Sequence, residues 1–288
     1  MSNPSPAVRV LKYSTLALFV GWGLLHIFWE VPYRALLWKE AWMSGIIERI
    51  FGMKWGDYVS SERAESIISS AIVAIGGFHL LCAASVFTLH SHGQKFARML
   101  LLGSLSLLFV GFLLFLNTGY QLAVWLEQAL QISAPLFLFA LCVKKIPANR
   151  LILPMKIVIA ITFISHGLYA MGVLPVPGDF VDMFIMTIGV NESQARMLLK
   201  LVGVMDLVLG VAIFIPRTAI PALIYACIWG FLTAIARPWA HIDDISSFQN
   251  ITYWLLQGLY RLPHAGLPLA LLLMIRSSTQ TQRKDGTP

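Results

Sequence analysis

The stretch MLLLGSLSLLFVGFLLFL, residues 99–116, decides the fold class because its 18 positions contain neither a charged residue nor a proline. A helix of that length rises about 27 Å, which is close to the hydrocarbon thickness of a bilayer. Similar apolar blocks lie on either side of it, at residues 13–31, 66–89, 122–143, 157–174, 197–215, 220–236 and 253–275. We therefore predict an all-α, polytopic membrane protein with eight transmembrane helices.

The composition of the 288-residue chain excludes a water-soluble enzyme. Hydrophobic residues make up 58% of it and charged residues only 12%, whereas soluble domains carry about 25% charge. The mean hydropathy of +0.74 also excludes a disordered chain. A β-barrel is not expected either, because its strands would appear as segments of about ten residues with alternating hydrophobicity.

The distribution of charge predicts the topology. Twelve of the 21 basic residues, but only one of the 14 acidic residues, lie in the two termini and in alternate loops. Because cytoplasmic loops carry the excess of Lys and Arg, both termini are predicted to be cytoplasmic, in a bacterial inner (cytoplasmic) membrane. The net charge of +7 is therefore attributed to membrane topology. The expected partner is the lipid bilayer, and no nucleic acid is expected. The twelve residues are Arg9, Lys12, Lys95, Arg98, Lys144, Lys145, Arg150, Lys156, Arg217, Arg276, Arg283 and Lys284.

The two halves of the chain resemble each other. We predict a first four-helix unit over residues 1–145 and a second over 146–288, packed as two parallel bundles about an axis along the membrane normal. Chance similarity between Leu-rich and Gly-rich helices is the alternative. Residues 32–65 of the first unit, which mix tryptophans with charges, are expected to lie in the outer interface or to form a small folded cap. The aligned pairs include Gly76 with Gly203, His26 with His166, His79 with Asp206, and Gln131 with His264.

Ionisable side chains inside the predicted spans of the second half are the candidates for a site. Each is unfavourable in a membrane helix by about 2.5–3.5 kcal/mol on insertion scales, so such residues tend to face a bundle interior. A lone carboxylate such as Asp206 should be paired or protonated there. We predict an outward-facing, buried polar site, with structural hydrogen bonds between helices as the alternative. Its members are His166, Asp206, Arg237, Arg261 and His264.

Four further residues are weaker candidates, namely His26, Glu30, His79 and His241, the last followed in the outer loop by Asp243 and Asp244. His26 and Glu30 share a helix face, but with only His79 as an obvious third ligand we predict no metal site. Paired histidines can hold haem in a four-helix bundle. The pairs available are His26 with His79 and His166 with His264.

Three short motifs of the second half resemble the DoxX-like family of four-helix membrane proteins, over residues 155–275. They are Ser165-His166-Gly167, GVMDLVLG at 203–210, and WGFLTA at 229–234 running into Arg237-Pro238. The resemblance implies redox or quinone partners, as for the membrane subunit of thiosulfate–quinone oxidoreductase, and a site at His166, Asp206 and Arg237. The first half departs from this resemblance. His79 stands at the position aligned with Asp206, and Thr118-Gly119 stands at the position aligned with Arg237-Pro238.

Three functions are consistent with these residues. The first is a quinone-linked membrane subunit, in which His166, Asp206, Arg237 and His264 supply donors and a proton path. No electron carrier is evident in the sequence, so this function needs a redox-partner protein, and whether the chain is itself an oxidoreductase stays open. The second is a transporter or small-ligand-binding protein that clamps an anionic or zwitterionic ligand with Arg237 and Arg261. The third is a scaffold without a ligand.

Overall fold

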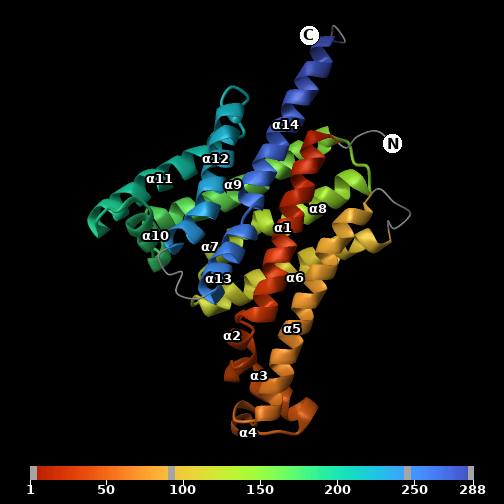
Figure 1. Ribbon diagram of the computed structural model, residues 1–288, viewed down its shortest axis with the longest axis vertical. Helices are drawn as coiled ribbons and strands as arrows, with labels where there is room; N and C mark the ends of the chain where they lie inside the picture. Colours follow the sequence, from red (N-terminus) through yellow and green to blue (C-terminus); the bar gives the residue numbers. More distant parts are fainter. Residues whose placement is uncertain (1–4, 90–94, 243–247, 285–288) are drawn as a thin grey trace.

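The computed structural model describes residues 5–89, 95–242 and 248–284, and every regular element in these ranges is a helix (Figure 1). The all-α prediction is confirmed. The long helices are α1 (Pro6–Phe28), α5 (Glu62–Ser85), α6 (Met99–Asn117), α8 (Ala129–Cys142), α9 (Ala148–Ala170), α11 (Glu192–Ala212), α12 (Ala219–Ala240) and α14 (Pro263–Lys284). The shorter ones are α2 (Arg34–Leu37), α3 (Glu40–Phe51), α4 (Trp55–Val59), α7 (Leu122–Leu126), α10 (Gly178–Ile188) and α13 (Phe248–Leu259).

Seven helical stretches within the described ranges are long and apolar enough to cross a membrane. They support the predicted integral membrane protein. The predicted span at 197–215 falls in α11 and is not among the seven, because α11 carries Arg196, Lys200 and Asp206. The seven are Pro6–Phe28, Glu62–Thr88, Phe96–Asn117, Leu122–Cys142, Ala148–Ala170, Ala219–Ala240 and Phe248–Ser277.

Two of these stretches are each built from two consecutive helices. Glu127 and Gln128 separate α7 from α8, and residues 260–262 separate α13 from α14. The second break has a local cause, since Pro263 begins α14, and a proline disfavours helical geometry in the residue before it. Irregular backbone at membrane depth is tolerated where it lines a cavity. Each break also contains a charged residue, which is Glu127 in the first break and Arg261 in the second.

The helices pack around one continuous core. α1 lies against α5, α8 and α14, while α9 lies against α11, α14 and α8 (Figure 1). A hydrophobic cluster runs from α1 through α8 and α9 to α14, so it joins residues on both sides of the predicted boundary at 145–146. The start of α1 and the end of α14 lie at the same end of the molecule (Figure 1).

Glycines allow the closest helix crossings. A Cβ atom on Gly76 of α5 would lie 2.7 Å from the carbonyl oxygen of Gly23 of α1. A Cβ atom on Gly203 of α11 would lie 2.8 Å from the carbonyl oxygen of Gly167 of α9. Only a residue without a side chain lets the two backbones approach so far, as in other membrane helix pairs.

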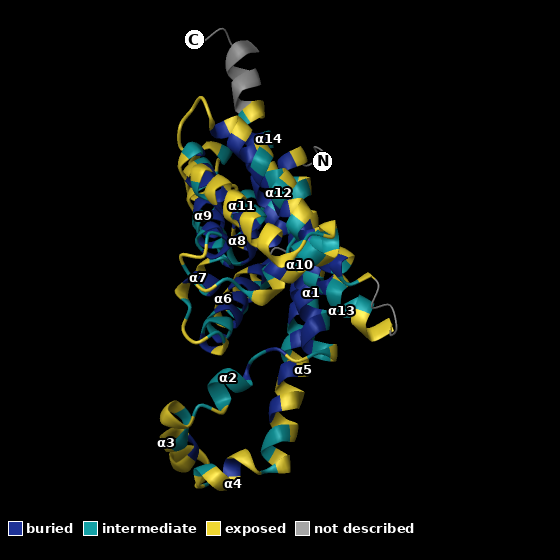
Figure 2. Cartoon of the chain, turned by 90° about the vertical axis from the view of Figure 1, so that its left-hand side faces the viewer, coloured by how far each residue is buried: buried dark blue, intermediate teal, exposed yellow. Residues whose placement is uncertain are grey.

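The segment predicted to be interfacial forms α2, α3 and α4 and projects from the end of the bundle beside α5 (Figures 1 and 2). Arg34 ties its start to the helices, through ion pairs with Glu30 and Glu65. The ring of Trp42 stacks on Phe112 of α6 at 6.4 Å between centroids. The segment is therefore helical and anchored at α6, and its position relative to the membrane stays a prediction.

The crossing of α1 and α5 predicts opposite effects at two adjacent glycines. Gly76→Ala forces the backbones apart, so the free energy of unfolding should fall by about 1–3 kcal/mol. Gly77 has nothing within 4 Å of its ideal Cβ position, so Gly77→Ala should stabilise the helix by about 0.5–1 kcal/mol. Thermal unfolding of the two variants in detergent measures the difference. Equal unfolding temperatures would contradict the close crossing.

Candidate functional site

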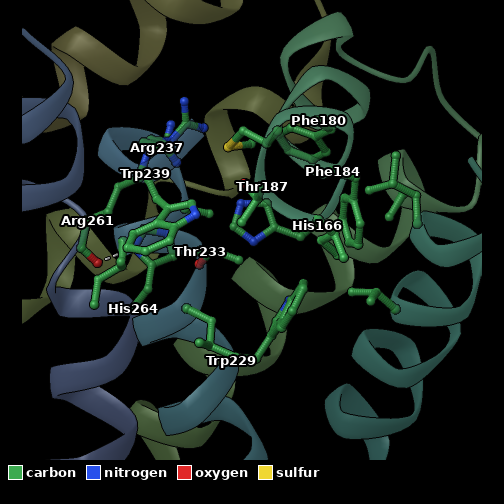
Figure 3. A pocket seen from close by; sticks show the side chains of 18 of the residues that line it. His166, Phe180, Phe184, Thr187, Trp229, Thr233, Arg237, Trp239, Arg261 and His264 are labelled. Carbon is green, nitrogen blue, oxygen red and sulfur yellow. Dashed lines mark hydrogen bonds between the residues drawn. The ribbon is translucent and has the colours of Figure 1, made fainter. Parts of the chain in front are cut away.

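A cavity of about 390 Å³ lies between α9, α10, α11, α12 and the break before α14 (Figure 3). Its size falls within the range usual for small-molecule sites. All five residues predicted for the polar site line it, although they come from four helices and one break. These residues are His166, Asp206, Arg237, Arg261 and His264.

The walls of the cavity are mainly apolar. α10 contributes Phe180, Met183, Phe184 and Ile188, none of which belonged to the predicted site. Other apolar side chains come from α11 and α12, namely Leu199, Val202, Trp229, Leu232, Ile235 and Trp239. The cavity thus joins a hydrophobic surface to a small set of polar groups, the usual composition of a ligand site.

His264 presents an unprotonated nitrogen to its surroundings. Its Nδ1 lies 3.0 Å from the carbonyl oxygen of Arg261. Because a carbonyl oxygen only accepts, Nδ1 carries the proton in the neutral ring, and Nε2 holds a lone pair. That Nε2 atom is buried and lacks a hydrogen-bond partner among the described residues. The ring stacks on that of His166, with centroids 5.6 Å apart and planes at 22°.

His166 is paired with an acid from the other half of the chain. Its Nε2 lies 3.3 Å from Oε2 of Glu127, whose side chain is only 13% exposed. Glu127 sits in the break between α7 and α8 and was not among the predicted site residues. The sequence did carry a signal for it, since an acid inside the predicted span 122–143 is as unfavourable as Asp206.

Asp206 is held by a tyrosine that the sequence reasoning also missed. The carboxylate is 1% exposed, and its Oδ1 accepts a hydrogen bond of 2.9 Å from the hydroxyl of Tyr225 on α12. Within the described ranges it forms no ion pair with His166 or Arg237. The polar residues of the cavity therefore form separate pairs, Asp206 with Tyr225 and Glu127 with His166, and not one continuous network.

Arg237 is buried and Arg261 is partly buried, and neither has an acid within ion-pair distance among the described residues. Arg237 lies in the last turn of α12 and is 6% exposed. Arg261 lies over the ring of Tyr260, at 5.2 Å from its centroid. Neither forms an ion pair in the part of the chain that the structure describes, from which Asp243 and Asp244 are absent. Buried charges are normally paired.

Four atoms around the cavity share the same condition: they are buried and have no hydrogen-bond partner among the described residues. We call them the open polar atoms, and three belong to predicted site residues. The fourth is the hydroxyl of Thr187 on α10. The open polar atoms are Nε of Arg237, Nε of Arg261, Nε2 of His264 and Oγ1 of Thr187.

His26 and His79 form a second buried cluster, away from the cavity. The Nδ1 atom of His26 donates to the carbonyl oxygen of Trp22 at 2.6 Å, and its Nε2 accepts from the Tyr33 hydroxyl at 3.0 Å. Burial raises the pKa of that hydroxyl, so it stays protonated and donates. The ring of His79 lies 4.8 Å from that of His26. Both its nitrogens lack a hydrogen-bond partner in the described part of the chain.

The remaining candidates do not line the cavity. Glu30 is exposed and pairs with Arg34 at 3.0 Å, so it does not join His26. His241 stacks on Trp254 with centroids 3.4 Å apart and bonds to the carbonyl oxygen of Arg237 through Nδ1 at 2.8 Å. Among the described residues, no group of three or more His, Cys, Asp or Glu side chains is placed to hold a metal ion.

Neither histidine pair fits a haem. Axial ligation needs one free imidazole nitrogen on each side of the iron. Both nitrogens of His26 are engaged, with Trp22 and Tyr33. His166 is engaged with Glu127, and its ring is stacked almost parallel to that of His264 instead of facing it across an iron.

Comparison with known proteins returned no relatives: no protein-family model, curated protein or solved structure matches the chain. The resemblance to the DoxX-like family therefore rests on the three short motifs and stays a prediction.

Proposed function

We propose that the chain is a membrane-embedded binding protein for a small, lipid-soluble molecule with a polar head. The observation that carries the proposal is a cavity whose mainly apolar walls include Arg237, Arg261 and His264, residues that each carry one of the open polar atoms. A scaffold without a ligand would leave buried donors and acceptors unsatisfied, each unfavourable by about 1–3 kcal/mol. A bound head group relieves that penalty.

The distribution of side chains around the cavity supports an amphipathic ligand. Arg237, Arg261 and His264 lie on one side, and Phe180 and Phe184 lie on the opposite side (Figure 3). A molecule with a polar head and an apolar body matches this arrangement in one orientation. A fully polar solute would leave Phe180 and Phe184 exposed to water, and a hydrocarbon would leave the open polar atoms without hydrogen-bond partners.

The proposed architecture is two four-helix units with α11 as an eighth span, both termini cytoplasmic and the cavity facing outward. Its support is the corresponding packing of α1 on α5 and of α9 on α11, each crossing at a pair of glycines. Of the three charged residues of α11, Asp206 is turned inward and bonded, whereas Arg196 and Lys200 are exposed in the first half of the helix. The charge asymmetry of the loops supports the orientation in a bacterial inner membrane.

A quinone-linked function is the second candidate. A quinone supplies two-electron, two-proton chemistry when bound, and its carbonyl oxygens would accept hydrogen bonds from the guanidinium groups of Arg237 and Arg261. The specific observation in favour is Nε2 of His264, which is free to accept a proton from a reduced head group. The Glu127–His166 pair beside it can hold a further proton. Electrons would come from a redox-partner protein.

Filling the cavity should abolish binding. Val202 lines the cavity, whereas Val204 on the same helix is 45% exposed on the outside of the molecule. We expect the unmodified chain to co-purify with a small molecule, and Val202→Trp, in which the indole occupies the ligand volume, should lose it. Val204→Trp, the matched control, should retain it. Mass spectrometry of organic extracts makes the measurement, and equal retention by the two variants would contradict the proposal.

The quinone candidate makes a narrower prediction. Removing the acceptor in His264→Phe, which keeps an aromatic ring, should weaken the binding of a short-chain quinol, whose hydroxyl donates to Nε2, about tenfold, the usual loss for one buried hydrogen bond. His241→Phe should leave it unchanged, because His241 lies outside the cavity lining. Quenching of the cavity tryptophans Trp229 and Trp239 reports binding. Unchanged affinity in His264→Phe would remove the quinone from consideration at this position.

A further inference from the structure

We propose that the head group of the ligand is a carboxylic acid that is bound as its carboxylate between Arg237 and Arg261. This inference rests on the proposed function, because it names the class of molecule that the cavity accepts. The ligand is then a small lipid-soluble acid with an apolar chain or ring.

The balance of charge in the cavity is the first argument. Two guanidinium groups line it, and no acid among the described residues forms an ion pair with either, although Glu127 and Asp179 lie near enough to attract Arg237. Asp206 accepts from Tyr225, and Glu127 lies against His166. Two like charges in a site of low dielectric constant repel each other strongly. An anion between them replaces that repulsion with attraction and supplies the counter-charge that buried arginines normally have.

The hydrogen-bonding character of the open polar atoms is the second argument. The Nε atoms of Arg237 and Arg261 are donors, while Nε2 of His264 is an acceptor. The head group must therefore offer an acceptor and a donor together, and a carboxylic acid has both on one planar group. A planar oxygen pair also matches the fork of donors on a guanidinium.

These positions define a simple proton movement on binding. An acid that enters from the bilayer is neutral, and its hydroxyl donates to Nε2 of His264. When the O–H bond breaks, the proton forms an N–H bond with Nε2, and the electron pair stays on the oxygen. The carboxylate then faces the imidazolium and the two guanidinium groups. No other reactant is required, and the reverse transfer allows the neutral acid to leave into the lipid.

The apolar walls of the cavity indicate the nature of the rest of the ligand. Phe180 and Phe184 of α10 face Arg237, Arg261 and His264 across the cavity, so the body of the ligand extends toward α10 (Figure 3). The volume is that of a site for a single small ligand. A single-chain acid is consequently favoured over a two-chain phospholipid.

The test compares a brominated acid with its neutral counterpart on the full chain in a neutral detergent. The probes are 11-bromoundecanoic acid and 11-bromoundecanol, whose bromine quenches the cavity tryptophans Trp229 and Trp239. The acid should bind at least about tenfold more tightly than the alcohol, since hydrogen bonds to charged groups are the stronger class.

Charge removal should erase that preference. Arg237→Gln and Arg261→Gln should each lower the affinity for the acid toward that of the alcohol, and leave the alcohol unchanged. Arg196→Gln is the matched control, because Arg196 is exposed on α11 and pairs with Glu192 at 2.8 Å. If Arg237→Gln does not fold, Arg237→Lys keeps the charge but removes the fork, and together with Arg261→Gln it retains the test.

The outcomes separate this inference from the proposed function. Equal affinity for acid and alcohol in the unmodified chain, with quenching lost in Val202→Trp, would overturn the acid assignment and leave the binding function in place. Quenching that survives in Val202→Trp, or its absence for both probes, would overturn the binding function itself. A preference for the acid that persists in both Arg237→Gln and Arg261→Gln would overturn the role of the arginines.

Discussion

The close approach of helix backbones at glycines is the constraint on which the candidate site depends. Gly167 and Gly203 bring α9 against α11, and a Cβ atom on Gly230 of α12 would lie 2.4 Å from the carbonyl oxygen of His264. His166 precedes the first glycine, and Asp206 lies one turn after the second. With larger residues at these crossings the helices would separate, and the polar side chains beside them could not share one cavity. The glycines of the three short motifs of the second half therefore have a packing role that is independent of any chemistry.

The two halves of the chain depend on each other for their polar groups. Glu127 of the first half pairs with His166 of the second. In the opposite direction, Tyr260 of the second half stacks on Trp22 of the first, with centroids 4.4 Å apart. These contacts explain why the core is continuous across the predicted boundary. They also mean that a site assigned to residues 146–288 alone would be incomplete.

The sequence predicts the helices and the convergence of the polar residues because both follow from local rules. Apolar length indicates a span, and an unfavourable side chain such as Asp206 or His264 must face inward. Partners that depend on tertiary packing could not be predicted. Tyr225 is an ordinary tyrosine within an apolar helix, and nothing in its sequence neighbourhood indicates Asp206 across the helix interface. Hydrophobicity averaged over a window passes through the breaks at Glu127 and Arg261, although the acid in the first and Pro263 after the second are local signals of them.

The contrast between the two buried clusters shows what makes one of them a site. His26 and His79, the residues aligned with His166 and Asp206, lie against each other in the first half, but no arginine accompanies them in the alignment of the halves. The indole of Trp22 fills the space beside His26 and donates to Gln131 at 2.9 Å, and Gln131 is the residue aligned with His264. His26 is fully bonded by the protein itself. The Nε atoms of Arg237 and Arg261 and Nε2 of His264 lack such partners among the described residues, and so do both nitrogens of His79. Only the residues of the second cluster line the cavity described above, so there a ligand can replace an interaction that the protein does not supply.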